Sequence, residues 1–231
     1  MTRILVIGGS QGIGLAVCQA AVANGHFVRA MSRSGRLTQK VSVNCEAFTG
    51  NARSAADIAR ALDGIDVVVQ ALGVPPSPDL VFKPVSLFSE ATRVLLPEMM
   101  KAGVKKLVAV TGFGAGDSHA AINMMQKLPF NLLLKNAYDD KSIQEALIAE
   151  SELDWLIVRP GVLVNCPASG KYRVLSRPDE WRNGIVARTD VADFIVKRIG
   201  ADTLTREKPV IIRFPLSWPD SPKVRDRGFS A

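Results

Sequence analysis

The chain has 231 residues, of which 47% are apolar and 22% are charged, and 29 basic against 22 acidic side chains give a formal net charge of +7. This composition is typical of globular proteins and excludes the collagen-like, coiled-coil and intrinsically disordered classes. The length suits one α/β domain, and we assign residues 1–231 to a single domain.

Apolar stretches alternate with segments of helical periodicity, which is typical of a doubly wound parallel sheet of the Rossmann type with helices on both faces. The predicted strands are Arg3–Gly8, Phe27–Ser32, Ser42–Ala47, Asp66–Ala71, Lys106–Thr111 and Trp155–Arg159. The predicted helices are Gly12–Asn24, Ser54–Leu62, Ser86–Ala102, Asp140–Glu150 and Thr189–Ile199. Ser54 and Thr189 are the residue types that cap helix N-termini.

Three features of the sequence limit the partners that we expect. Glycines and polar residues interrupt the uncharged segment from Ile4 to Val28, so we predict no targeting or membrane-spanning segment. The five cations before Glu46 form no continuous run, which favours a local anion site over a nucleic-acid or membrane surface. The three cysteines lack disulfide or metal-ligand spacing, so we expect no metal site and a cytoplasmic location.

The first strand runs into a glycine-rich turn that opens the first helix. In this context the pattern predicts a dinucleotide site, because Gly8 permits the turn, Gly12 leaves room for a pyrophosphate and Gly14 lets the helix pack on the strand. The N–H groups at the helix start then bind the phosphates. The predicted cofactor-binding residues of this turn are Gly8, Ser10, Gln11, Gly12, Ile13 and Gly14. The alternative is a glycine turn without a ligand.

The charge after the second strand favours NADP over NAD. A site selective for NAD has an acidic residue about 20 residues after the glycines, where it binds the ribose 2′-hydroxyl. This chain has Ser32 and Arg33 there, with no acidic residue before Glu46. Arg33 can pair with a 2′-phosphate and stack on adenine, and Ser32 can donate a hydrogen bond. A solvated surface arginine is the alternative.

The Gly-x-x-x-Gly-x-Gly spacing resembles the fingerprint of the short-chain dehydrogenase/reductase superfamily. Other segments resemble its atypical, NmrA-like branch: Val28–Arg33, Ala71-Leu72-Gly73, Val110-Thr111-Gly112, Val158–Gly161 and Arg188–Ala192. The resemblance implies further cofactor contacts from Asn51, Ala52, Ala71, Leu72, Gly73, Thr111, Lys141, Pro160 and Gly161. Asn51 stands where an aspartate is common in the family, and a turn-forming role is equally open.

The catalytic signature of the superfamily is altered. Its members combine a Ser or Thr with Tyr-x-x-x-Lys, in which the tyrosine delivers a proton. The resemblance implies catalytic roles for Thr111, Lys141 and Tyr138, with Lys141 holding the nicotinamide ribose, but Tyr138 lies three residues before Lys141 instead of four. Tyr138 is either a displaced proton donor or a loop residue before a helix that begins at Asp139-Asp140. We favour the loop, because paired acids suit a first helical turn.

Residues 137–141 resemble the matching segment of the biliverdin reductase B/flavin reductase group, which lacks this tyrosine. The resemblance implies NADPH-dependent hydride transfer to a flat conjugated acceptor such as a flavin, a quinone or a tetrapyrrole-like compound. We expect substrate loops within 112–136 and 161–188, where His119 is a candidate proton source and Phe113, Met124, Met125, Leu128 and Phe130 offer apolar surface.

Two other functions stay open: a non-catalytic NADP-binding redox sensor of NmrA type, and a carbonyl reductase or epimerase-like enzyme with a displaced tyrosine. The expected partner is a small-molecule substrate, and the sequence leaves a homodimer open.

Overall fold

The computed structural model describes residues 1–74, 83–121, 134–201 and 204–215. Within them, the main sheet has eight strands in the order β3-β2-β1-β4-β5-β6-β10-β8. These strands are β1 (Arg3–Ile7), β2 (Phe27–Ser32), β3 (Cys45–Thr49), β4 (Val67–Gln70), β5 (Lys106–Val110), β6 (Asp154–Pro160), β8 (Arg173–Leu175) and β10 (Val210–Ile212). All neighbours pair in parallel except β10 and β8. The predicted α/β Rossmann fold is confirmed, with a sheet wider than predicted.

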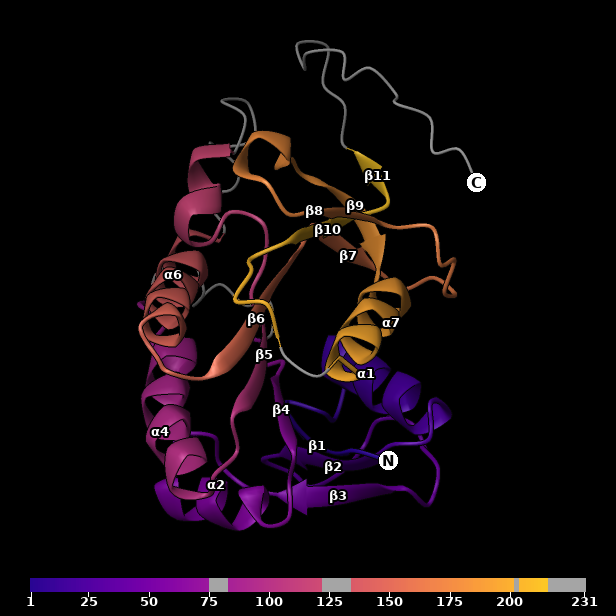
Figure 1. Ribbon diagram of the computed structural model, residues 1–231, viewed down its shortest axis with the longest axis vertical. Helices are drawn as coiled ribbons and strands as arrows, with labels where there is room; N and C mark the ends of the chain where they lie inside the picture. Colours follow the sequence, from indigo (N-terminus) through magenta and orange to yellow (C-terminus); the bar gives the residue numbers. More distant parts are fainter. Residues whose placement is uncertain (75–82, 122–133, 202–203, 216–231) are drawn as a thin grey trace.

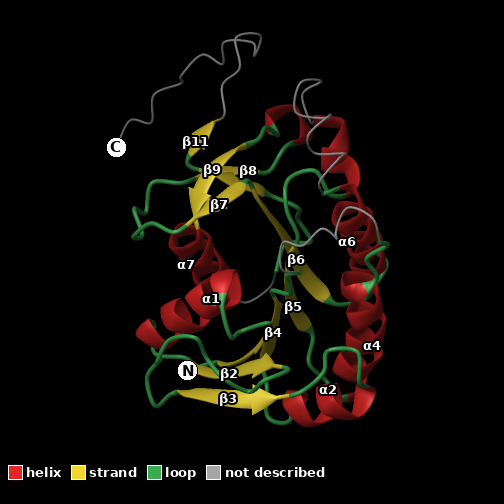
Figure 2. Ribbon diagram, turned by 180° about the vertical axis from the view of Figure 1, so that it is seen from behind, coloured by secondary structure: helices red, strands yellow, loops and turns green. Residues whose placement is uncertain are grey.

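Helices cover both faces of this sheet. On one face lie α1 (Gly12–Ala23) and α7 (Arg188–Ile199), and on the other lie α2 (Ala55–Leu62), α4 (Leu87–Lys101) and α6 (Lys135–Ala149) (Figures 1 and 2). A buried apolar cluster fills each layer between sheet and helices. Strand β1 therefore contributes side chains to both clusters, as its continuous apolar sequence predicts.

A smaller sheet in the order β11-β9-β7 follows the carboxyl end of β6. Its strands are β7 (Val162–Val164), β9 (Gly184–Ala187) and β11 (Phe214–Pro215), and the short 3₁₀ helices are η1 (Gly116–Ala121) and η2 (Pro178–Glu180). None of the helices in the described part of the chain combines the length and apolar character needed to cross a bilayer.

Helix α6 begins at Lys135, so the predicted start at Asp140 is wrong. The buried Asp140 carboxylate accepts hydrogen bonds from Phe88 N at 2.7 Å and Ser89 N at 3.3 Å. It therefore satisfies the N-terminus of the neighbouring helix α4 and not that of its own helix. As a consequence, Tyr138 lies in the first turn of α6, and its interpretation as a loop residue is also wrong.

Two further boundaries depend on contacts between distant segments. Strand β3 is shifted from the predicted 42–47 because its pairing with β2 continues to Ser32 and Thr49. Helix α7 begins at Arg188, and Thr189 Oγ1 donates to Cys166 O at 2.8 Å, so Thr189 is not its N-cap. Ser54 does cap α2, with its hydroxyl oxygen accepting from Asp57 N at 3.3 Å.

Candidate cofactor and acceptor site

The glycine turn lies where the strand order reverses between β1 and β4, which is where doubly wound sheets bind ligands. Gly8 N donates to Met31 O at 2.9 Å, which ties the turn to the end of β2. Gly8 has a φ of +89°, and a Cβ there would lie 2.6 Å from Ala71 O, beyond the end of β4. Only glycine therefore fits between the ends of the two neighbouring strands.

The start of α1 provides space and hydrogen-bond donors. A Cβ on Gly14 would lie 2.1 Å from Gly8 O, so this glycine lets the helix approach the strand closely. Gly12 has a φ of +57°, and nothing lies within 4 Å of its missing Cβ. The first turn of α1 contains no acidic residue, and Gln11 makes no capping hydrogen bond through its side chain. The first N–H groups therefore remain available to an anion.

The segment after β2 brings two arginines to this turn. Thr38 donates to Ser10 O through its backbone N at 3.0 Å and through Oγ1 at 2.9 Å. Arg33 and Arg36 are exposed on the segment between Ser32 and Thr38. Ser32 therefore ends β2, and Arg33 follows it on the exposed segment that Thr38 ties to the glycine turn.

The predicted adenine-side residues form a turn beside Ser32. Gly50 N donates to Ser32 O at 3.0 Å, and Asn51 and Ala52 follow. Asn51 N donates to the Asp57 carboxylate at 2.9 Å, and this bond is the main cause that lowers the pKa of Asp57. Asn51 Oδ1 accepts from Arg53 N at 3.1 Å, as in an Asx turn. Its side chain therefore has a turn-forming role whether or not it also contacts adenine.

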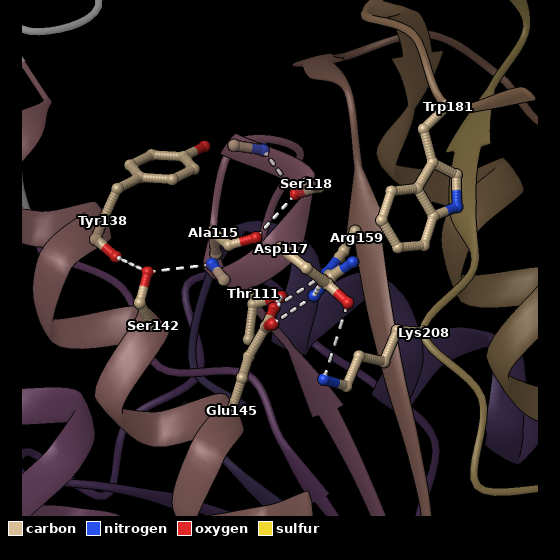
Figure 3. Close-up of polar contacts among 12 residues, drawn as sticks. Thr111, Ala115, Asp117, Ser118, Tyr138, Ser142, Glu145, Arg159, Trp181 and Lys208 are labelled. Atoms are coloured by element: carbon tan, nitrogen blue, oxygen red, sulfur yellow. Dashed lines mark hydrogen bonds and ion pairs between the residues drawn. The ribbon is translucent and has the colours of Figure 1, made fainter. Parts of the chain in front are cut away.

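A buried polar network lies at the ends of β5 and β6 (Figure 3). Thr111 Oγ1 donates to Glu145 Oε1 at 2.7 Å, and Arg159 Nε donates to the same oxygen at 3.0 Å. Arg159 Nη2 also donates to Glu145 Oε2. Glu145 and Arg159 are both buried. Burial alone would lower the pKa of Arg159, but the Glu145 and Asp117 carboxylates raise it above its usual value.

Helix η1 is held against this ion pair. Its Asp117 pairs with Arg159 Nη2, and Lys208 Nζ lies 3.9 Å from the other Asp117 oxygen. On the opposite side the Trp181 ring stacks on Arg159, with 4.9 Å from the guanidinium carbon to the ring centroid (Figure 3). A Cβ on Gly116 would lie 2.4 Å from Glu145 Oε2, so η1 approaches as closely as a glycine allows.

Lys141 and Tyr138 lie on one face of α6. Lys141 Nζ donates to Thr111 O and lies 5.5 Å from the centroid of the Tyr138 ring. Burial lowers the pKa of Lys141 to about 8, although the nearby Glu145 charge opposes the shift. Burial raises the pKa of Tyr138 to about 12. A Cβ on Gly112 would lie 2.6 Å from the Tyr138 hydroxyl, which therefore lies next to the end of β5.

A pocket of about 390 Å³ opens between η1 and the start of α6. Its lining residues are Gly114, Gly116, His119, Lys135, Tyr138, Asp139 and Ser142. They come from the predicted substrate loop within 112–136 and from α6. Met124, Met125, Leu128 and Phe130 lie outside the described residues.

The structure thus brings most predicted residues together along the carboxyl ends of the strands, and it adds Glu145, Arg159 and Asp117, which the sequence interpretation did not assign. The sequence did contain one signal for them: Arg159 lies at the end of an apolar strand. A cation buried there needs an acidic partner, which the structure identifies as Glu145 and Asp117.

A family model described as NAD(P)H-binding matches residues 8–202. The chain belongs to this family, in the atypical branch of the short-chain dehydrogenases/reductases. The match confirms the resemblance derived from the sequence, and it places the chain in an oxidoreductase family that binds NAD(P).

The individual proteins that resemble this chain share a quarter of its residues or fewer. The Photosystem II assembly factor Ycf39 of Synechocystis is 25% identical over 218 residues, which are 90% of this chain but only 62% of that protein. The solved structure of ChuY, an anaerobilin reductase from Escherichia coli O157:H7, is 24% identical with a TM-score of 0.74, covering 96% of this chain and 100% of that one. A Veillonella parvula short-chain dehydrogenase/reductase in complex with NADP is 15% identical with a TM-score of 0.74, covering 91% and 94%. Both structures share the fold of this chain.

Proposed function

We propose that the chain is an NADPH-dependent reductase that transfers a hydride to a flat conjugated acceptor such as a flavin, a quinone or a tetrapyrrole-like compound. When bound, NADPH would supply that hydride at its nicotinamide ring. The chain's own residues have three tasks: they bind the dinucleotide, orient the nicotinamide beside the pocket and determine which acceptors can react.

The glycine turn fits a dinucleotide. The open space at Gly12 and the free N–H groups of α1 suit a pyrophosphate. Arg33 offers a charge-assisted hydrogen bond to a 2′-phosphate, and no carboxylate near it on the chain would repel that phosphate. We therefore assign the adenine end of the cofactor to Ser32, Arg33 and the turn at Asn51 and Ala52.

We assign the nicotinamide end of the cofactor to residues that follow β4, β5 and β6, on the far side of the point where the strand order reverses. Ala71, Leu72 and Gly73 follow β4, Pro160 ends β6, and Gly161 follows it. Lys141, which is already directed at Thr111 O, would hold the nicotinamide ribose. Its pKa of about 8 leaves it mostly protonated at pH 7, so it can donate to ribose hydroxyls.

The choice of a conjugated acceptor rests on the absence of a suitable proton donor among the two predicted catalytic hydroxyl groups. The Thr111 hydroxyl donates its hydrogen to Glu145, and the pKa of Tyr138 is raised to about 12, so neither group is set to protonate a carbonyl oxygen. A conjugated acceptor spreads the incoming charge over its own atoms and depends less on such a donor. The anaerobilin reductase with this fold is a precedent for reductase chemistry on the same scaffold.

The test is oxidation of NADPH, followed by its absorbance, with a flavin, a quinone, a linear tetrapyrrole and a simple aldehyde as acceptors. We expect oxidation with at least one conjugated acceptor and little with the aldehyde. NADPH binding without oxidation by any acceptor would refute the proposal and support the redox sensor. Preference for the aldehyde would instead support a carbonyl reductase with a displaced tyrosine.

A further inference from the structure

Two cysteines from different elements meet beneath the glycine turn. Cys18 lies on α1 and is fully buried, whereas Cys45 is the first residue of β3 and is half-buried. Both side chains pack in the apolar cluster beneath α1, and the two thiols lie close enough together for each to shift the pKa of the other. Neither cysteine has a role in the proposed reduction.

The position of the Cys18 sulfur is linked to that of the turn. Cys18 Sγ donates a weak hydrogen bond to Gly9 O at 3.7 Å. A Cβ on Gly9 would lie 3.1 Å from this sulfur and 2.9 Å from the Ala30 methyl group. Ala30 pairs with Ala47, two residues after Cys45 on the same face of β3. The backbone of Gly9 therefore rests on Cys18 and on β2, with no spare space between them.

We propose that Cys18 and Cys45 are a peroxide-sensitive thiol pair, whose oxidation to a disulfide weakens dinucleotide binding at the adjacent glycine turn. The second part rests on the proposed function, because it concerns the dinucleotide affinity of this turn.

The chemistry needs one hydroperoxide for each disulfide. The half-buried Cys45, as its thiolate, attacks one peroxide oxygen, and the O–O bond breaks to leave Cys45 as a sulfenic acid. The hydroxide or alkoxide that leaves takes up the proton that Cys45 released and becomes water or an alcohol. The Cys18 sulfur then attacks the Cys45 sulfur, the S–O bond breaks, and a second water leaves with the Cys18 proton. Two thiols are oxidised and the peroxide is reduced. The contact between the thiols lowers the pKa of Cys45 against the effect of burial, which favours Cys45 as the attacking group.

The structural effect follows from bond length. An S–S bond is about 2.05 Å long, much shorter than a hydrogen-bonded contact between sulfurs. Its formation draws Cys18 Sγ towards β3 and away from Gly9 O. Because Gly9 packs directly on that sulfur, the turn loses one of its supports.

The first experiment tests the bond itself. The protein used is the full chain with Cys166→Ser, which removes the exposed third cysteine. This protein is reduced and then treated with hydrogen peroxide. Intact mass and peptide mapping are expected to reveal the loss of two hydrogens and a peptide linking Cys18 to Cys45. Cys45→Ser in the same background should abolish this product. Two thiols that stay open to alkylation after denaturation, or a Cys45 sulfenic acid that never becomes a disulfide, would overturn the proposal.

The second experiment tests the coupling by calorimetric titration of NADPH into the reduced and oxidised Cys166→Ser protein. We expect the oxidised form to bind at least about tenfold more weakly, equivalent to losing one good phosphate hydrogen bond, and reductant to restore the affinity. The Cys45→Ser control should not respond to peroxide. Equal affinities of the two forms would refute the coupling. Failure of the reduced protein to bind NADPH would instead refute the proposed function, while disulfide formation stands on the mass measurement.

Discussion

The Thr111 hydroxyl donates its hydrogen to Glu145 Oε1 across 2.7 Å, and Arg159 donates to the same oxygen across 3.0 Å. A carboxylate can only accept hydrogen bonds, so Thr111 has its lone pairs left for a ligand. Thr111, which resembles the catalytic Ser or Thr of the superfamily, is therefore oriented to accept a hydrogen bond from a ligand and not to donate one. It suits a ribose hydroxyl or an amide N–H better than a carbonyl oxygen.

Glu145→Gln should destabilise the fold by about 3 kcal/mol, because it removes the charge that compensates the buried Arg159. Glu150→Gln is the matched control: it lies at the end of the same helix but is exposed, so we expect a change within about 0.5 kcal/mol. Urea unfolding followed by circular dichroism measures both. Equal midpoints for Glu145→Gln and the wild type would contradict this account of the ion pair.

Lys141 should make stability depend on pH in the alkaline range. Its pKa falls from 10.5 to about 8 on folding, so between these values the unfolded chain binds more protons and stability rises with pH. Below pH 8 the charged form is held at a cost, and Lys141→Met should be about 3 kcal/mol more stable than the wild type at pH 7. This difference should vanish near pH 10.5.

The exposed Lys105 is the control for that experiment. Lys105→Met should run parallel to the wild type at every pH, with the urea midpoint as the readout. A constant difference between Lys141→Met and the wild type from pH 7 to about pH 10.5 would argue against a depressed lysine pKa.

Gly12→Val should abolish NADPH binding, because the side chain occupies the space that the pyrophosphate needs. Gly25→Val at the other end of α1 is a matched control, since Gly25 also has a positive φ, of +78°, and nothing within 4 Å of its missing Cβ. Both variants lose stability through backbone strain, but only Gly12→Val should lose binding in a calorimetric titration. Comparable affinities for the two variants would place the phosphates elsewhere.

Arg33→Ala should weaken NADPH binding by about 1.5–3 kcal/mol and leave NADH binding nearly unchanged, because it removes a charge-assisted hydrogen bond to the 2′-phosphate. Arg93→Ala, an exposed arginine on α4, should change neither affinity. Titrations with both cofactors give the selectivity. Equal losses for NADPH and NADH would mean that Arg33 does not contact the phosphate.

Tyr138→Phe should leave kcat within about threefold, far from the 10²–10⁴ expected for the loss of a general acid. The reason is its raised pKa of about 12. Tyr172→Phe controls for the loss of a hydroxyl elsewhere, because that group bonds to Asp193 at 2.9 Å. Steady-state rates with the best acceptor provide the measurement. A hundredfold loss specific to Tyr138→Phe would restore the tyrosine as a proton donor.

Sequence patterns correctly predicted the elements whose structure depends on interactions between residues close in sequence. The glycine turn and the strands β1, β2, β4, β5 and β6 depend on residues close in sequence, and their predicted positions agree with the structure. The start of α6 could not be predicted, because Asp140 caps a helix that begins at Leu87. The short strands β8 and β10 carry too few residues for a periodic signal.

The polar network escaped prediction for a related reason. Glu145 and Arg159 lie on different elements, and only the packing of α6 against β6 shows that they meet. Both charged side chains are buried in the structure, but a charged residue on a helix is usually exposed to solvent. Nothing in the local sequence therefore distinguished Glu145 from Glu150.

Gly116 limits how this scaffold can change. Its hydrogen is all that fits between η1 and the Glu145 carboxylate, while its N–H donates to Ser142 Oγ at 2.8 Å. A larger residue there would push η1 away from the ion pair that joins α6 to β6. The part of the pocket lined by Gly116 is thus fixed by the same contacts that hold two structural elements together. A change of acceptor would therefore have to use other residues that line the pocket, such as His119 and Lys135.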